Sequence, residues 1–206
     1  MRFEELCKTL SEKKYYVFSL EDVCVFFPKE KKDTLKQYLS RWKKSGRVAT
    51  LRKGLYELTF PERRVSSDMY LANKIYAPSY VSLDTALSHY SLIPEISMAV
   101  LSITPKPTRR FKNDHGLFVY RSVQPKAFCG YRIENHGGVD ILIAEPEKAL
   151  TDFLYFNTLR AQRAQKVDLS SLRLNTKRLA RLNRKKLDHY GRIYGMDVKG
   201  ILHAYL

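Results

Sequence analysis

The chain has 206 residues, 44% of them hydrophobic, and carries a formal net charge of +16. This apolar content is enough for a folded core and argues against a disordered protein. No run of 18 apolar residues is present, so we expect no membrane span. The first 16 residues lack the apolar centre of a secretory signal, which favours a cytoplasmic protein.

The positive charge is concentrated towards the two ends. Residues 1–64 carry 16 Lys or Arg against 9 Asp or Glu, and residues 158–206 carry 12 against 3. Residues 65–157 are balanced at 9 against 9. Basic surfaces attract polyanions because each neutralised phosphate releases counterions. The pattern therefore favours a nucleic-acid partner over a surface that is only solvated.

The first 60 residues predict a small unit that opens with helices. Apolar residues at helical spacing predict a first helix over 3–14. Ser19 is suited to cap a second helix, with acidic residues in its first turn. That helix should end before Pro28, because the residue preceding a proline avoids the helical conformation.

A third helix and a hairpin complete this unit. The helix lies within 29–46 and should stop at Gly46. Its apolar stripe consists of Leu35, Tyr38, Leu39 and Trp42. Two β-prone runs, 47–52 and 55–59, then flank Lys53-Gly54, which predicts a hairpin with its turn at this pair.

Three helices followed by a hairpin are typical of a winged helix-turn-helix, so we assign residues 1–60 to a DNA-binding domain of that kind. Gln37 and Arg41 can make bidentate base contacts, and the neighbouring lysines suit phosphates. The alternatives are a solvated basic helix and a winged domain that binds protein. The candidate DNA contacts are Lys31, Lys32, Thr34, Lys36, Gln37, Ser40, Arg41, Lys44, Arg52 and Lys53.

After a linker at 61–64, residues 65–206 predict a larger α+β domain with a mixed or antiparallel sheet and a helical C-terminal tail. The expected helices are 67–76, 82–90, 145–164, 176–190 and 197–205. The expected strands are 96–104, 116–123, 128–135 and 139–144. There are no internal repeats.

The stretch YVSLDTALSHYSLIPE, residues 80–95, holds the polar side chains of Ser82, Asp84, Ser88 and His89. A nucleophile and its base must lie within hydrogen-bond reach, but adjacent positions on a helix diverge. Leucine, alanine and tyrosine follow the helical period instead. We therefore interpret the stretch as a core helix with Ser82 at its N-cap, not as a catalytic cluster.

The stretch VDILIAEPEK, residues 139–148, raises a second enzymatic possibility. Metal-dependent nucleases place an acid on one strand and a Glu-x-Lys on the next. Here the lysine follows Glu147 directly, and Pro146 starts a helix. We expect structural roles for these residues, and a nuclease remains the alternative.

The C-terminal region supplies a further basic candidate. In a single helix over 176–190, four cations would form one stripe, and they are Lys177, Arg181, Arg184 and Lys185. This possible secondary face could contact a DNA backbone, dock an acidic protein or be merely solvated. The sequence does not rank the first two.

Neither metal nor cofactor chemistry has support in the sequence. Cys7, Cys24 and Cys129 are far apart, and neither they nor the five histidines have the spacing of zinc ligands. No phosphate-binding glycine motif is present. We expect reduced thiols, no metal, no cofactor and no enzymatic activity.

Three segments are similar to the AbiEi-type antitoxins of bacterial type IV toxin–antitoxin systems. They are RKGLYEL in the hairpin, YAPSYVSLDTALSHYSLIPE, and DILIAEPEKALTDFLYF. The resemblance extends from about residue 15 to 165 and is weaker in the basic tail. It implies an N-terminal winged helix-turn-helix that represses its own operon, and a larger C-terminal domain associated with antitoxin action.

In this family the toxin is a nucleotidyltransferase-like protein, and direct contact with it is not to be assumed. The resemblance places DNA reading on Lys31–Lys44 and Arg52–Lys53, and transfers no catalytic role. We therefore expect a transcriptional autorepressor and antitoxin that binds double-stranded DNA at its own promoter, at inverted repeats, as a monomer or as a dimer. The rivals are a nucleic-acid enzyme and a protein–protein module.

Overall fold

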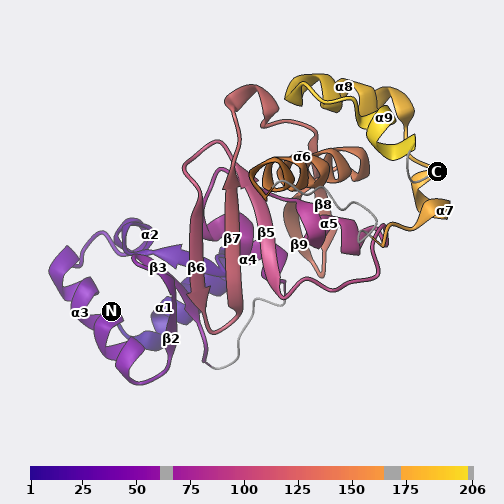
Figure 1. Cartoon of the computed structure of the whole chain (residues 1–206). Helices are drawn as coiled ribbons and strands as arrows, with labels where there is room; N and C mark the ends of the chain where they lie inside the picture. Colours follow the sequence, from indigo (N-terminus) through magenta and orange to yellow (C-terminus); the bar gives the residue numbers. More distant parts are fainter. Residues whose placement is uncertain (61–66, 165–172, 204–206) are drawn as a thin grey trace.

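The computed structural model describes residues 1–60, 67–164 and 173–203, and these form an α+β fold with two sheets (Figure 1). The predicted linker at 61–64 and the end of the helix predicted over 197–205 lie outside the described residues. Figure 1 shows the N-terminal helices at one end of the molecule and the last helices at the other, with the larger sheet between them.

The N-terminal part alternates helices with short strands around its own core. Its elements are α1 (Phe3–Glu12), β1 (Val17–Ser19), α2 (Leu20–Phe26), α3 (Lys32–Lys44), β2 (Val48–Arg52) and β3 (Leu55–Leu58). The strands form an antiparallel sheet in the order β1-β3-β2. Buried apolar side chains from the three helices and the sheet make one cluster that includes Leu6, Leu35 and Trp42.

Local sequence signals explain most of these boundaries. Ser19 Oγ accepts the main-chain N–H of Asp22, whose carboxylate accepts the N–H of Ser19 at 2.7 Å, so α2 starts with a reciprocal cap. The helix ends before Pro28, as predicted. Gly54 adopts a φ of +79° in the turn between β2 and β3, a conformation that glycine adopts without steric cost. The hairpin prediction is therefore confirmed, whereas the short strand β1 was not predicted.

The second sheet has six strands and is mixed. The elements around it begin with α4 (Asp68–Ile75), β4 (Tyr80–Val81), α5 (Leu83–His89), β5 (Ala99–Thr104), β6 (Arg109–Asn113) and β7 (Gly116–Ser122). The 3₁₀ helix η1 (Pro125–Ala127), β8 (Tyr131–His136), β9 (Val139–Ala144) and α6 (Pro146–Ala164) follow. The strand order is β6-β7-β5-β4-β9-β8, in which β5–β7 and β4–β9 are parallel and the other pairs antiparallel.

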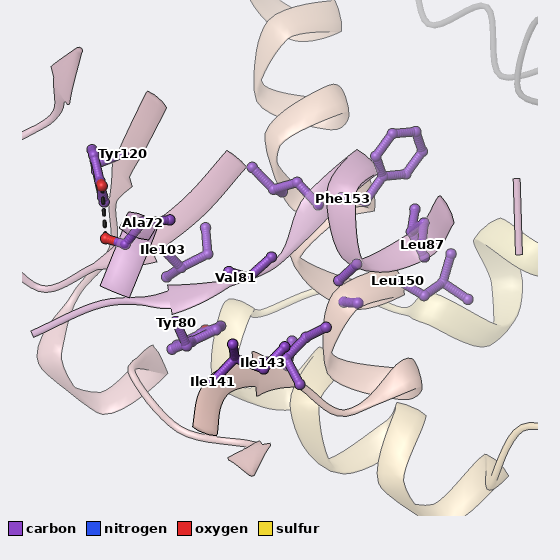
Figure 2. Packing of buried hydrophobic residues seen from close by; sticks show 14 of the residues in the cluster. Ala72, Tyr80, Val81, Leu87, Ile103, Tyr120, Ile141, Ile143, Leu150 and Phe153 are labelled. Carbon is purple, nitrogen blue, oxygen red and sulfur yellow. Dashed lines mark hydrogen bonds between the residues drawn. The ribbon is translucent and has the colours of Figure 1, made fainter. Parts of the chain in front are cut away.

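The main core lies between this sheet and its helices. Figure 2 shows strand residues such as Tyr80, Val81 and Ile143 packed near Leu150 and Phe153 of α6. On α4, the Ala72 carbonyl accepts a hydrogen bond of 2.7 Å from the hydroxyl of Tyr120 on β7, drawn as a dashed line (Figure 2). Burying a large apolar side chain contributes about 1.5–3 kcal/mol, and a buried tyrosine hydroxyl usually has a hydrogen-bond partner, as Tyr120 has here.

The C-terminal region differs from the prediction. Instead of one helix over 176–190, it forms α7 (Thr176–Leu179) and α8 (Arg184–Tyr194), followed by α9 (Val198–His203). Asn183 starts α8, because its side-chain oxygen accepts the N–H groups of Lys185 and Lys186. The Asn183 N–H in turn donates to Glu147 Oε1 at 2.8 Å. A contact 36 residues away in sequence thus fixes the break.

The two sheets meet where the N-terminal hairpin packs on β6 and α4. Leu51 and Leu55 belong to the main core cluster, although they lie on the N-terminal hairpin. The amide of Asn113 at the end of β6 donates to the Leu51 carbonyl at 3.1 Å. Apolar and polar contacts therefore hold the N-terminal hairpin against the larger sheet and α4, and the hairpin does not stand alone.

Candidate nucleic-acid interface

Helix α3 has one buried apolar side and one polar side that faces solvent. Leu35, Leu39 and Trp42 are at most 4% exposed. The Trp42 ring packs edge-on against Phe3 at 5.2 Å and stacks with Tyr38 at 5.7 Å. This packing fixes the rotation of α3 about its axis, so the opposite side of the helix faces solvent in a defined orientation.

The predicted DNA contacts of α3 lie on that solvent side. Lys36, Gln37, Ser40, Arg41 and Lys44 are exposed, as are Lys31 and Lys32 at the helix start, whereas Thr34 is half-buried. The structure therefore brings these side chains onto one helix surface, except that Thr34 is partly covered.

Two of the cations on this surface have neighbours that orient them. The Arg41 guanidinium lies 5.1 Å from the centre of the Tyr38 ring, a cation–π contact. Lys32 Nζ lies 3.4 Å from a carboxylate oxygen of Glu21 on α2. A main-chain hydrogen bond and Lys32 lower the pKa of Glu21. Because both members of the Lys32–Glu21 pair are exposed, the pair is weak and a phosphate could replace the carboxylate.

The two predicted DNA contacts at the hairpin tip, Arg52 and Lys53, differ in their exposure to solvent. Lys53 is exposed, but Arg52 is half-buried and donates from Nε to the Ile75 carbonyl of α4 at 2.5 Å. It also donates from a terminal nitrogen to the Lys53 carbonyl at 3.0 Å. Arg52 therefore links the hairpin to α4, whereas the side chain of Lys53 is open to solvent.

A second basic surface was missed in the sequence. On the edge strand β6, Arg109, Arg110 and Lys112 are exposed, and so is Arg121 on β7. The strand register puts Arg110, Lys112 and Arg121 on the same side of the sheet. Four cations fall between residues 106 and 112 without an acid. Acidic residues elsewhere in 65–157 balance this local excess, so the net charge of the whole segment does not reveal it.

The predicted stripe in the tail does not form. Lys177 lies in α7, Arg181 in the turn after it, and Arg184 and Lys185 in the first turn of α8. All four are exposed. However, the break before Asn183 means that no single helix aligns their side chains on one side. They form a loose basic region instead of one line of charge.

A fully buried polar group lies elsewhere, between β4 and α6. Asp152 accepts hydrogen bonds from Ser82 Oγ at 2.8 Å and from Tyr80 at 3.1 Å. The Tyr194 hydroxyl donates to the same carboxylate at 2.5 Å, and the ammonium of Lys148 contacts it too. Burial, with a further effect of Asp152, raises the pKa values of Tyr80 and Tyr194 well above that of free tyrosine.

This buried group is structural. Ser82, Lys148 and Asp152 are essentially inaccessible to solvent, so no substrate can reach the serine oxygen. Ser82 occupies the N-cap position of α5, as predicted, but its side chain bonds to Asp152 and does not cap the helix. Such a network stabilises one packing of β4, α6 and α8, because every partner is needed to compensate the buried charges.

The remaining residues of the stretch 80–95 are dispersed. His89 Nε2 lies 2.6 Å from Glu134 Oε1 on β8. Burial raises the pKa of Asp84 on the first turn of α5. The hydrogen bonds of the described residues connect neither group to Ser82, so the stretch offers no nucleophile with an adjacent base.

The acids of the second enzymatic candidate also face different partners. Asp140 is exposed and accepts from Asn135, Glu145 binds Lys186 and Tyr190, and Glu147 binds the main chain at Asn183. Across residues 1–60, 67–164 and 173–203, no three His, Cys, Asp or Glu side chains gather where they could hold a metal ion.

Comparison with known proteins adds no relative to this picture, since neither a protein-family model nor a curated protein matches the chain. In the described parts of the chain, no helix has the length and apolarity to cross a bilayer.

Proposed function

We propose that the protein binds double-stranded DNA sequence-specifically through α3, with residues 1–60 acting as a winged helix-turn-helix. The observation that carries this proposal is the solvent-facing side of α3, where Gln37 and Arg41 are exposed over a buried stripe anchored by Trp42. The order α1, β1, α2, α3, β2, β3 supports a winged domain, in which the second helix of the helix-turn-helix pair enters the major groove.

Different side chains of α3 are suited to contact the DNA bases and the DNA backbone. An amide and a guanidinium can each form two hydrogen bonds with a base edge, whereas ammonium groups contact phosphates without sequence preference. Gln37 and Arg41 would therefore supply discrimination, and Lys36, Lys44 and Lys53 would supply affinity. The exposed cations on β6 and β7 belong to strands next to the hairpin, since β6 contacts β2, and they would add further contacts with DNA phosphates.

The biological role that we propose is repression of the protein's own operon combined with antitoxin activity against a nucleotidyltransferase-like toxin. This part rests on the similarity of three segments to AbiEi-type antitoxins. It is tested separately, by expressing the product of the neighbouring gene with and without this protein and measuring growth. If this protein does not restore growth, the antitoxin role is rejected while the DNA-binding proposal stands.

DNA binding is tested by fluorescence anisotropy of the purified protein on DNA from immediately upstream of its gene and on a scrambled sequence, across a salt series. We expect the upstream DNA to be preferred by a factor on the order of 10³ or more, with steep salt dependence. Equal and weak binding to both sequences would reject sequence-specific recognition and would favour an acidic protein partner.

A further inference from the structure

The two outer strands of the larger sheet, β6 and β8, differ in how they are protected. Edge strands present unpaired backbone groups, and charged residues deter another strand from pairing there. β6 carries Arg109, Arg110 and Lys112 and lies beside β2. A second copy of β6 would therefore be repelled by like charge.

The strand β8 has the opposite character. Within the described residues it pairs with β9 alone. Its central side chain, Ile133, is 69% exposed, and the neighbouring Tyr131 on the same side of the strand is 37% exposed. An apolar side chain in the middle of a six-residue open edge is a feature that a soluble protein normally covers.

The hydrogen-bond pattern tells which backbone groups of β8 point outwards. Just before the strand, the Glu145 N–H donates to the Gly130 carbonyl at 2.9 Å, so these two residues form a hydrogen-bonded pair. Bonded and non-bonded pairs alternate along an antiparallel ladder. With the register Ile133↔Leu142, the outward N–H and C=O groups belong to Tyr131, Ile133 and Asn135.

Because Ile133 is one of the residues whose N–H and C=O point outwards, β8 can pair in antiparallel fashion with β8 of a second copy about a two-fold axis at Ile133. In that arrangement, Ile133 bonds with Ile133 of the second copy, and Tyr131 with Asn135 of the second copy. Arg132 then lies opposite Glu134 of the second copy, in a non-hydrogen-bonded pair, where side chains approach most closely. The strand is thus self-complementary in backbone, apolar contact and charge, as an isologous interface requires.

We propose that the protein forms a homodimer by antiparallel pairing of β8 with β8 of a second copy, which joins the two six-stranded sheets into one. The interface is small, so the dimer is a weak one that depends on protein concentration. This inference does not depend on DNA binding, although a two-fold dimer would match an operator with inverted repeats.

The mass of the purified full chain is measured by sedimentation equilibrium over a concentration series, without DNA, at about 0.3 M salt to screen the positive charge. We expect the mass to rise from 24.1 kDa towards twice that value. Ile133→Lys should abolish the rise, because it places two cations opposite each other on the axis. Arg109→Glu on the other edge is the matched control and should leave the rise unchanged.

A charge exchange tests the register. Arg132→Glu alone places two carboxylates opposite each other, and Glu134→Arg alone places two guanidinium groups opposite each other, so each variant should be monomeric. A mixture of the two variants restores both opposite-charge pairs and should form the heterodimer. Near-native thermal unfolding of each variant is checked first, since Arg132 and Glu134 also form an ion pair of 3.0 Å within one chain and Glu134 contacts His89.

The proposal is overturned if the native chain stays at 24.1 kDa at the highest concentration, or if Ile133→Lys dimerises like the native chain. It is also overturned if the mixed charge variants remain monomeric while the native chain dimerises, because the pairing would then use another register or another surface. Association in the mixture together with its absence in each variant supports it.

Discussion

His115 Nε2 lies 2.7 Å from Glu57 Oε1, and this contact joins the turn between β6 and β7 to the central strand of the N-terminal sheet. Both side chains are almost completely buried, and the other ring nitrogen of His115 lies 3.3 Å from Asp68 at the start of α4. One imidazole thus contacts β3 of the N-terminal sheet on one side and α4 on the other.

Replacing His115 should loosen the attachment of the N-terminal unit. We expect His115→Ala to lower the free energy of unfolding by about 1–3 kcal/mol, because the variant removes a hydrogen bond to a buried carboxylate. Urea unfolding, followed by circular dichroism, measures this change in the free energy of unfolding. His189→Ala, at an exposed site on α8, is the control and should have little effect. An unchanged midpoint for His115→Ala would show that the contact contributes nothing to stability.

The buried carboxylate of Asp152 should be among the most sensitive positions. We expect Asp152→Ala to cost about 3–5 kcal/mol, since it leaves the ammonium of Lys148 buried without its counterion. Ser82→Ala removes one neutral donor to the same carboxylate and should cost about 1 kcal/mol. Chemical denaturation of both variants checks the ranking, and the account is contradicted if the serine variant is the less stable one.

The pair of Glu145 and Lys186 predicts a pH dependence. Burial raises the pKa of Glu145, but hydrogen bonds from Lys186 and Tyr190 outweigh it and leave the pKa below its ordinary value. Because its pKa is lower in the folded state, ionised Glu145 stabilises the fold at pH values above the unfolded-state pKa. This contribution is lost as the pH falls through the folded-state pKa.

Lys186→Met should therefore reduce stability at pH 7, by about 0.5 kcal/mol because the lysine is partly solvent-exposed. The difference from the native protein should shrink as the pH falls below the ordinary glutamate pKa of about 4.3. Urea unfolding of both proteins at several pH values measures this trend, and a difference that grows towards acid pH would contradict it.

The cations on β6 and β7 should contribute sequence-independent affinity for DNA. We expect Arg110→Ala, Lys112→Ala and Arg121→Ala, combined, to weaken binding to upstream and scrambled DNA alike. Removing one cation that binds a phosphate should reduce the salt slope by about 1. The charge-conserving set Arg110→Lys, Lys112→Arg and Arg121→Lys is the control. If the alanine set left both affinities unchanged, DNA would not reach this part of the sheet.

The three helices and the hairpin of residues 1–60 can be predicted from the sequence because their signals are local. Ser19 and Asp22 are three residues apart, and Lys53-Gly54 is a turn within a hairpin, so each element carries its own start and stop signals. The α+β class also follows from the pattern of apolar runs, whereas the choice between a mixed and an antiparallel sheet does not, because it depends on which strands pair in space. The exposed side of α3 was predictable because the apolar stripe of Leu35, Leu39 and Trp42 fixes what lies opposite.

Most elements that the sequence does not predict depend on partners that are distant in the chain. β1 is a three-residue strand that pairs with β3 about 40 residues later. β6 is different, because its partner β7 follows after a short turn, and its mostly charged and polar residues give no apolar strand signal. The break between α7 and α8 depends on Glu147, far away in the chain. Arg52 is predicted as a DNA contact at the hairpin tip because the sequence does not show that it binds the Ile75 carbonyl on α4.

The most direct test of DNA reading by α3 is the ratio of affinities for upstream and scrambled DNA in the Gln37→Ala, Arg41→Ala double variant, compared with the native protein. Each bidentate base contact is worth about 1–3 kcal/mol of discrimination, so we predict that the ratio falls roughly tenfold or more. Lys36→Ala and Lys44→Ala should lower both affinities and preserve the ratio. A double variant that keeps the native ratio would contradict the account, because α3 would not be the element that reads the sequence.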